Sequence, residues 1–106
     1  MVSSEAIQEL CNRIIQGFHP ERIILFGSYA YGTPRDGSDV DLLVVFPFEG
    51  SNLHKAVEIV RQVKPTFSVD LLAHTPEQLQ QRIAWNDFFL REITEKGKVL
   101  YATPDR

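Results

Sequence analysis

Residues 24–46 of the chain read ILFGSYAYGTPRDGSDVDLLVVF, and this stretch decides the fold. It joins two apolar runs typical of buried strands, Arg22–Phe26 and Asp39–Phe46, through a polar segment that contains glycine. The ten residues from Tyr29 to Ser38 fill most of this connection, which is shorter than the dozen or more residues of a parallel crossover. We therefore expect an antiparallel pair, in which the residues after the first strand lie beside those that open the second.

The rest of the chain alternates between helix and strand patterns. Apolar residues at i, i+3 and i+4 predict a helix over Ser4–Phe18. Further on we expect a helix over Asn52–Val63 with Leu53, Ala56, Val57 and Val60 on one face, a strand over Thr66–Ala73, a helical region from Pro76 to about Glu95 with interruptions, and a strand over Lys98–Ala102. The predicted fold class is α/β (α+β): a single small domain spanning residues 1–106, with helices packed on a mixed β-sheet.

Two of the predicted helices have recognisable start signals. Ser51 precedes the second helix and can cap it, and Thr75-Pro76 with Gln78 forms the pattern of a capping box. Both helices are followed by a stop signal, Pro65 after the second and Gly97 after the last.

Composition places the chain among ordinary soluble globular domains. Of its 106 residues 43% are hydrophobic and 24% are charged, with a formal net charge of −3. A general nucleic-acid binder would show a basic stripe instead. The one cysteine, Cys11, excludes a disulfide framework within the chain and is expected in the core. There is no signal-peptide pattern and no run near the ~20 apolar residues of a membrane span, so we expect no membrane association and a cytoplasmic location.

Three aspartates point to metal chemistry. Asp39 and Asp41 stand two apart at the start of a strand, so their side chains share a face and repel each other unless a cation lies between them. Oxygen ligands of this kind suit Mg²⁺, which keeps several waters and takes its remaining ligands from substrate phosphates. Asp70 sits inside the apolar run of the third strand, where we expect it to be buried and to share the same metal.

The turn at Gly27-Ser28 has the features of a phosphate site. Glycine lets the backbone approach a phosphate closely, and a turn of helix that starts near Ser28 would direct free N–H groups at the anion. The Ser28 hydroxyl can bind a phosphate oxygen. Ser38 and Arg35, from the same loop, are further candidates for nucleotide binding, although Ser38 also suits a hydrogen bond with the local backbone.

Taken together, these residues resemble the DNA polymerase β-like nucleotidyltransferase superfamily, and most of all its minimal nucleotidyltransferase (MNT) branch. The resemblance rests on Gly27-Ser28, the Asp39-x-Asp41 pair at its spacing, and Asp70 in the third strand. It implies that Gly27 and Ser28 hold the triphosphate of ATP and that the three aspartates are the catalytic metal ligands for two Mg²⁺ ions. A hydroxyl would then attack the α-phosphate, release pyrophosphate and accept a nucleoside monophosphate, which we expect to be AMP.

The chain departs from this family at one position and lacks one part. Tyr31 stands where members commonly carry arginine, and Arg35 in the same loop is a candidate to replace it. About 35 residues follow Asp70, too few for the acceptor-binding domain of larger members. Minimal members often pair with a helical HEPN protein, and some transfer AMP to a tyrosine of that toxin, so the resemblance implies an antitoxin in a hetero-oligomer.

Two alternatives stay open beside the HEPN-partnered enzyme. The chain could neutralise a partner by binding it with little turnover, which the loss of arginine at Tyr31 would favour. It could also be a homodimeric enzyme that modifies aminoglycosides. The sequence identifies neither the acceptor nor the preferred base.

Other chemically interesting side chains have ordinary interpretations. His19 and His54 are expected on the surface, whereas His74 follows the third strand and could approach the site. Tyr29 and Tyr31 are expected to pack under the loop, with stacking on a base as the alternative. Three aromatic residues near the C-terminal helix are expected in the core, with a partner-binding surface as the alternative; they are Trp85, Phe88 and Phe89.

Overall fold

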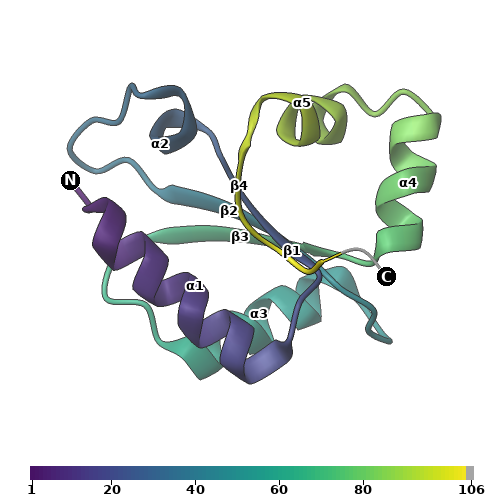
Figure 1. Ribbon diagram of the computed structural model, residues 1–106, viewed down its shortest axis with the longest axis horizontal. Helices are drawn as coiled ribbons and strands as arrows, with labels where there is room; N and C mark the ends of the chain where they lie inside the picture. Colours follow the sequence, from purple (N-terminus) through teal and green to yellow (C-terminus); the bar gives the residue numbers. More distant parts are fainter. Residues whose placement is uncertain (105–106) are drawn as a thin grey trace.

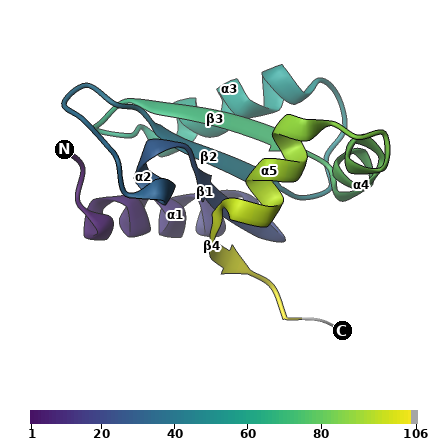
Figure 2. The same cartoon turned by 90° about the horizontal axis from the view of Figure 1, so that it is seen from above.

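A four-stranded mixed sheet, whose strands lie side by side in Figure 2, organises the computed structural model, which describes residues 1–104. Its strands run in the order β3-β2-β1-β4, with bounds β1 (Arg22–Phe26), β2 (Val40–Val45), β3 (Val69–His74) and β4 (Lys98–Ala102). The central strand β1 pairs antiparallel with both β2 and β4, and β2 pairs parallel with β3. The predicted antiparallel pair and mixed sheet are therefore confirmed.

Helices cover both faces of this sheet (Figure 1). Helices α1 (Ser4–Phe18) and α3 (Asn52–Val63) pack on one face, and α4 (Pro76–Ala84) and α5 (Phe88–Lys96) pack on the other. The short helix α2 (Ser28–Tyr31) follows directly on β1. Alternate side chains of β2 divide between the two layers: Leu42 and Val44 lie in the core with α1 and α3, and Leu43 and Val45 in the core with α4 and α5.

The predicted helix starts are formed as the sequence indicates. Ser51 accepts a hydrogen bond from the backbone N–H of His54 at 3.2 Å, and Thr75 and Gln78 form both bonds of a capping box. The interruption in the last helical region is the break between α4 and α5. There Asn86 adopts φ +62° and Asp87 caps the new helix by accepting from Leu90 N at 3.1 Å.

Some expectations about boundaries and faces were wrong. Strand β3 begins at Val69 rather than at residue 66, and Asp39 lies just before β2. The buried stripe of α3 consists of Ala56, Ile59 and Val63, whereas Leu53 is 71% exposed and Val57 40% exposed. The physical reason is the position of α3 over β3: this strand forms the edge of the sheet, so nothing beyond it covers the outer side of the helix.

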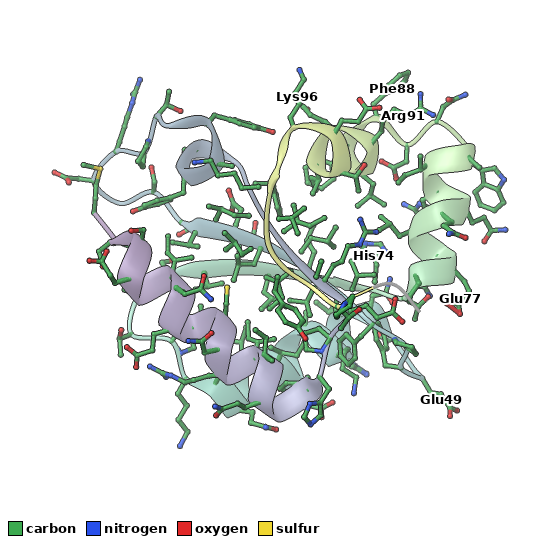
Figure 3. The ribbon with its side chains drawn as sticks, viewed as in Figure 1. Glu49, His74, Glu77, Phe88, Arg91 and Lys96 are labelled. Carbon is green, nitrogen blue, oxygen red and sulfur yellow. The ribbon has the colours of Figure 1, made fainter. Side chains whose placement is uncertain are left out.

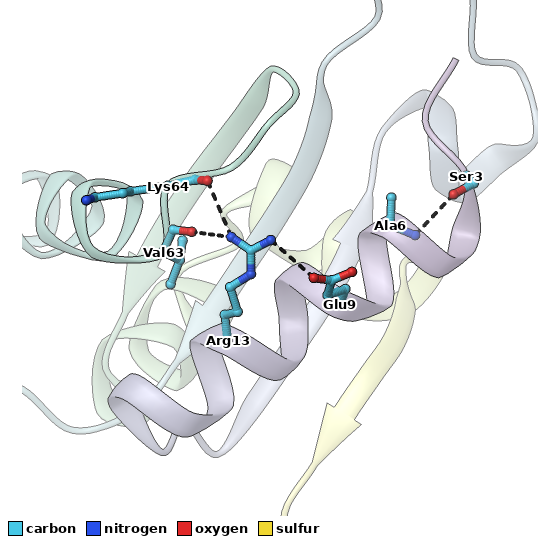
Figure 4. Close-up of polar contacts among 6 residues, drawn as sticks. All are labelled: Ser3, Ala6, Glu9, Arg13, Val63 and Lys64. Atoms are coloured by element: carbon cyan, nitrogen blue, oxygen red, sulfur yellow. Dashed lines mark hydrogen bonds and ion pairs between the residues drawn. The ribbon is translucent and has the colours of Figure 1, made fainter.

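One arginine side chain links the two helices of one layer. Arg13 Nη1 of α1 donates to the carbonyl oxygens of Val63 at 2.7 Å and Lys64 at 3.4 Å, and Nη2 donates to Glu9 at 3.4 Å (Figure 4). The last carbonyls of a helix have no partner within it, so Arg13 satisfies the C-terminus of α3.

We predict that Arg13→Met lowers the free energy of unfolding by about 1–2 kcal/mol, since it removes charge-assisted hydrogen bonds but keeps the aliphatic stem. Urea denaturation measures this loss. Glu9→Gln is the control, because it affects only the exposed ion pair with Arg13, a kind of contact worth about 0–1 kcal/mol. Equal losses in the two variants would contradict the role assigned to Arg13.

Candidate active site

Strand register brings the predicted site residues together at one end of the sheet. Phe26, the last residue of β1, is paired with Asp41, and Asp41 is paired with Asp70 on its other side. Gly27 follows Phe26 directly, so the glycine turn lies next to both carboxylates. Asp41 shares its side of β2 with Leu43, which places the two carboxylates on the face that α4 and α5 cover farther along.

Gly27 is fixed by two independent constraints. Its backbone has φ +72° and ψ −157°, a region that is essentially restricted to glycine. A Cβ atom at this position would also overlap Asp41 Oδ2. The chain therefore needs a glycine where β1 gives way to α2, because the Asp41 carboxylate lies directly against the backbone of the turn.

Asp39 approaches the same end of the sheet from outside the strand. Its Oδ1 accepts a short hydrogen bond from the Ser68 hydroxyl, and the backbone N–H of Val40 donates to Ser68 O at 3.0 Å. Ser68 thus orients Asp39 from the residue before β3. Sequence reasoning missed this partner, because Ser68 lies 29 residues away and only the parallel pairing of β2 and β3 brings it close.

The three carboxylates differ in their surroundings. Asp70 is exposed, which corrects the expectation of a buried aspartate: β3 is an edge strand, and the helices on this face do not extend over its start. Asp41 is partly buried. Burial raises the pKa of its carboxyl group above the usual value, and the charges of Asp70 and Asp39 raise it further.

This arrangement fits a cation that takes some of its ligands from the protein and the others from a bound substrate. In the part of the chain that the structure describes, no group of three or more His, Cys, Asp or Glu side chains is close enough to enclose a metal ion. The donor set is nevertheless purely carboxylate, and the charges repel one another at Asp41, which is the electrostatic situation that a divalent ion relieves. Mg²⁺ bound by few carboxylates with phosphate oxygens as further ligands suits such an open site.

The loop between α2 and β2 contains the candidate nucleotide-binding residues Ser38 and Arg35, and the structure supports them unequally. Ser38 accepts from the backbone N–H of Arg35 at 2.9 Å, and its own N–H donates to Arg35 O at 2.9 Å, so its hydroxyl serves the loop backbone as the alternative interpretation expects. The Arg35 residue is exposed. Tyr29 is partly buried and its hydroxyl accepts from Val2 N at 2.9 Å, whereas Tyr31 is 46% exposed.

A pocket of about 330 Å³ opens beside the carboxylates. It is lined by residues of β1, β2 and β3, of α2 and the turn before it, and of α5: Phe26, Gly27, Tyr31, Asp41, Asp70, Phe89, Glu92 and Ile93. Sequence reasoning did not find Glu92. The only signal was its place on α5 three residues after Phe89, which puts both side chains on one face of the helix.

The expectation that the three aromatic residues of the C-terminal region lie in the core was wrong. Trp85 is 69% exposed, Phe88 77% and Phe89 55%, and Figure 3 shows Phe88 directed away from the sheet. They lie at the junction of α4 and α5, where the chain turns at Asn86 and nothing packs over it. Phe89 contacts the sheet through its edge-on contact with Phe26, at 5.8 Å between ring centroids.

The histidines do not contribute to this site. His19 and His54 are exposed, as expected. His74 is the last residue of β3, four residues beyond Asp70 and thus about 13 Å along the strand. There its ring lies 3.5 Å from the Asn52 amide, and burial, followed by the charge of Arg82, lowers its pKa (Figure 3).

Comparison with known proteins agrees with this fold. A family model described as the nucleotidyltransferase domain matches residues 4–101. The chain belongs to this family of nucleotidyltransferases. Over 105 residues it is 29% identical to a protein of Methanocaldococcus jannaschii named "Putative protein adenylyltransferase MJ0604", a match that covers 95% of this chain and 100% of that protein.

Solved structures show the same fold. A crystal structure described as "a putative nucleotidyltransferase from Sulfolobus solfataricus" has a TM-score of 0.65 at 19% identity and covers 92% of this chain and 78% of its own. A toxin–antitoxin complex crystallised with AMP-PNP has a TM-score of 0.52 at 23% identity, covering 91% of this chain and 73% of its own. Separately, none of the helices within residues 1–104 is both long enough and apolar enough to span a bilayer.

We predict that Gly27→Ala destabilises the protein by more than the about 1–3 kcal/mol that the backbone conformation alone costs, because the methyl group also displaces Asp41. Gly37→Ala is the matched control. Gly37 also has a positive φ, of +85°, but a Cβ there meets nothing within 4 Å. Thermal unfolding of both variants measures the difference, and equal destabilisation would show that the contact with Asp41 is unimportant.

We further predict that Asp41→Asn stabilises the metal-free protein at neutral pH. A carboxyl group whose pKa is raised in the folded state binds more protons there than in the unfolded chain, so the free energy of unfolding falls as pH rises through the window between the two values. The amide that Asp41→Asn introduces does not titrate, so the variant does not lose free energy of unfolding in this way. Urea denaturation in EDTA from pH 3 to 8 should show a difference that grows as pH rises through this window, and a constant or inverted difference would refute the raised pKa of Asp41.

Proposed function

We propose that this chain is a single minimal nucleotidyltransferase domain that transfers AMP from ATP to a hydroxyl group of a partner protein. One observation carries the proposal: Asp41 and Asp70 are paired across β2 and β3, with Gly27 against Asp41 and Asp39 just before β2. The family match supports nucleotidyl transfer. Adenylyl transfer to protein is supported by the name of the relative from Methanocaldococcus jannaschii.

Each site residue has a role that its surroundings suit. Gly27 and Ser28 would hold the triphosphate at the turn, and Asp39 and Asp41 would hold one side of the metal site. Mg²⁺, which we propose binds as two ions, would neutralise phosphate charge and lower the pKa of the attacking hydroxyl when bound. Asp70, which is exposed, faces the direction from which an acceptor can approach.

The reaction balances without a further reactant. The acceptor oxygen forms a bond to the α-phosphorus, the bond from that phosphorus to the bridging oxygen of the β-phosphate breaks, and pyrophosphate leaves. The hydroxyl proton passes to Asp70 and then to water. The acceptor receives AMP, so label from the α-phosphate and not from the γ-phosphate ends on the product.

We propose that the acceptor is a tyrosine of a helical HEPN toxin, so that the chain acts as an antitoxin in a cytoplasmic hetero-oligomer. The three carboxylates of the site come from this chain, and Asp70 is open to solvent on the edge strand, where another molecule can supply the hydroxyl. The fold is shared with a toxin–antitoxin complex described as MntA-HpeT, in which two aspartates were changed to glutamate (20% identity, TM-score 0.52, 91% of this chain and 73% of that chain).

A second candidate function is neutralisation by binding alone. It is favoured by Tyr31, which lines the pocket where the family commonly has arginine, and by the absence of Arg35 from the pocket lining. In that case the chain would mask its partner with little turnover. An Asp39→Asn/Asp41→Asn variant that still suppresses the toxin fully would favour this function over transfer.

We predict that calorimetry detects binding of ATP only with Mg²⁺, and that Asp39→Asn/Asp41→Asn weakens it at least tenfold. With ATP labelled at the α-phosphate, a HEPN partner should become labelled by the wild type and not by the variant, and a tyrosine-to-phenylalanine change in the partner should abolish the label. Asp36→Asn is the control, because Asp36 is an exposed turn residue of the same loop. Unchanged transfer by the double variant would disprove the metal assignment.

A further inference from the structure

We infer that the pocket between α2 and α5 holds the base of the nucleotide and selects bases that carry an exocyclic amino group, such as adenine, over bases with a carbonyl group in its place. The inference rests on the proposed function, because it takes Gly27 and Asp41 as the triphosphate end of the site. Both residues line the pocket, so the 330 Å³ space beside them is open to the nucleoside of a nucleotide whose triphosphate lies at the turn.

Two aromatic side chains give the pocket walls that suit a flat ring. Phe89 comes from α5 and Tyr31 from α2, and they are 55% and 46% exposed. Phe89 is held in place by Phe26, a buried side chain whose ring lies at 85° to it. A partly exposed ring with a fixed orientation is a stacking surface, and the strength of stacking on an aromatic side chain depends little on which base is bound. Stacking therefore explains binding of a base but no choice among bases.

Glu92 is the residue that can discriminate among bases. Apart from Asp41 and Asp70, its carboxylate and the Tyr31 hydroxyl are the polar side-chain groups among the lining residues. Its contact with Lys96 is 3.9 Å long and joins two mostly exposed side chains, so it is too weak to keep the carboxylate from binding a ligand. An ionised carboxylate only accepts hydrogen bonds, so it favours the amino group of adenine and repels a carbonyl oxygen at the same position.

The geometry of α5 places these groups along one helical face. Phe89, Glu92 and Ile93 are three and four residues apart, so their side chains are neighbours, with Glu92 beside the stacking ring. The acceptor has a separate approach. A groove of about 390 Å³ between α3 and the edge strand also reaches Asp70, and it is lined mainly by apolar residues such as Val57 and Val69. We therefore assign the α5 pocket to the base and not to the acceptor.

The test compares MgATP with MgITP, which differ where adenine has an amino group and hypoxanthine a carbonyl. Calorimetry should show the wild type binding ATP at least about tenfold more tightly than ITP, because the preference rests on one hydrogen bond to a charged group. Glu92→Gln should reduce the ratio to less than about threefold, since an amide donates as well as accepts. Glu95→Gln, an exposed change on the same helix, should leave the ratio unchanged.

A second pair of variants tests the stacking wall. Phe89→Ala should weaken MgATP binding about tenfold and leave binding of Mg²⁺-tripolyphosphate unchanged, because tripolyphosphate has no base. Phe88→Ala is the control, as Phe88 is exposed and outside the pocket. Thermal unfolding establishes that each variant is folded.

The outcomes separate the two claims. Wild type that binds MgATP but does not distinguish it from MgITP, or that is insensitive to both Glu92→Gln and Phe89→Ala, overturns the base pocket and leaves the proposed function standing. In that case the pocket would be free for an acceptor ring. Folded wild type that binds neither nucleotide nor Mg²⁺-tripolyphosphate overturns the proposed function and the base pocket together.

Discussion

The close approach of the Gly27 backbone to the Asp41 carboxylate is the constraint on which the site depends. It follows from the antiparallel pairing of β1 and β2, which sets Phe26 opposite Asp41 and leaves the next residue of the chain against its side chain. No residue with a Cβ atom fits there. The same pairing starts α2 immediately after the glycine, so one register fixes the turn, the short helix and the first metal-binding carboxylate relative to one another.

The sheet keeps charged groups out of the core while placing them at the site. Beyond Asp41, the same face of β2 is apolar and packs under α4 and α5, and the other face packs under α1 and α3. Carboxylates occupy only the start of the strands, where the helical layer ends. Burial, and then the charges of Asp70 and Asp39, raise the pKa of Asp41, and this destabilises the metal-free protein at neutral pH. This cost is expected of a site that is completed by a cation and an anionic substrate.

Much of this could be predicted from local sequence. The helices, the short loop that forces β1 and β2 antiparallel, and the pair Asp39 and Asp41 follow from periodicity, caps and chain length, and the structure confirms the fold. The exposure of Asp70 could not be predicted, because an apolar run does not reveal which strand forms the edge of the sheet. The parts played by Ser68 and Glu92 could not be predicted either. The contact of Ser68 depends on the long-range pairing of β2 with β3, and the place of Glu92 depends on how α5 crosses the sheet. The metal and nucleotide roles of the aspartates remain predictions.

The most direct test of the central claim is where a divalent ion lies in the nucleotide-bound protein. Mn²⁺ can replace Mg²⁺, and its paramagnetism broadens the ¹³C signals of carboxylates that it touches. With ATP present, sub-stoichiometric Mn²⁺ should broaden the side-chain carboxyl signals of Asp39, Asp41 and Asp70 and spare those of Asp36 and Asp87. Uniform broadening of all aspartates, or selective broadening elsewhere, would contradict a metal site formed by the pairing of β2 with β1 and β3.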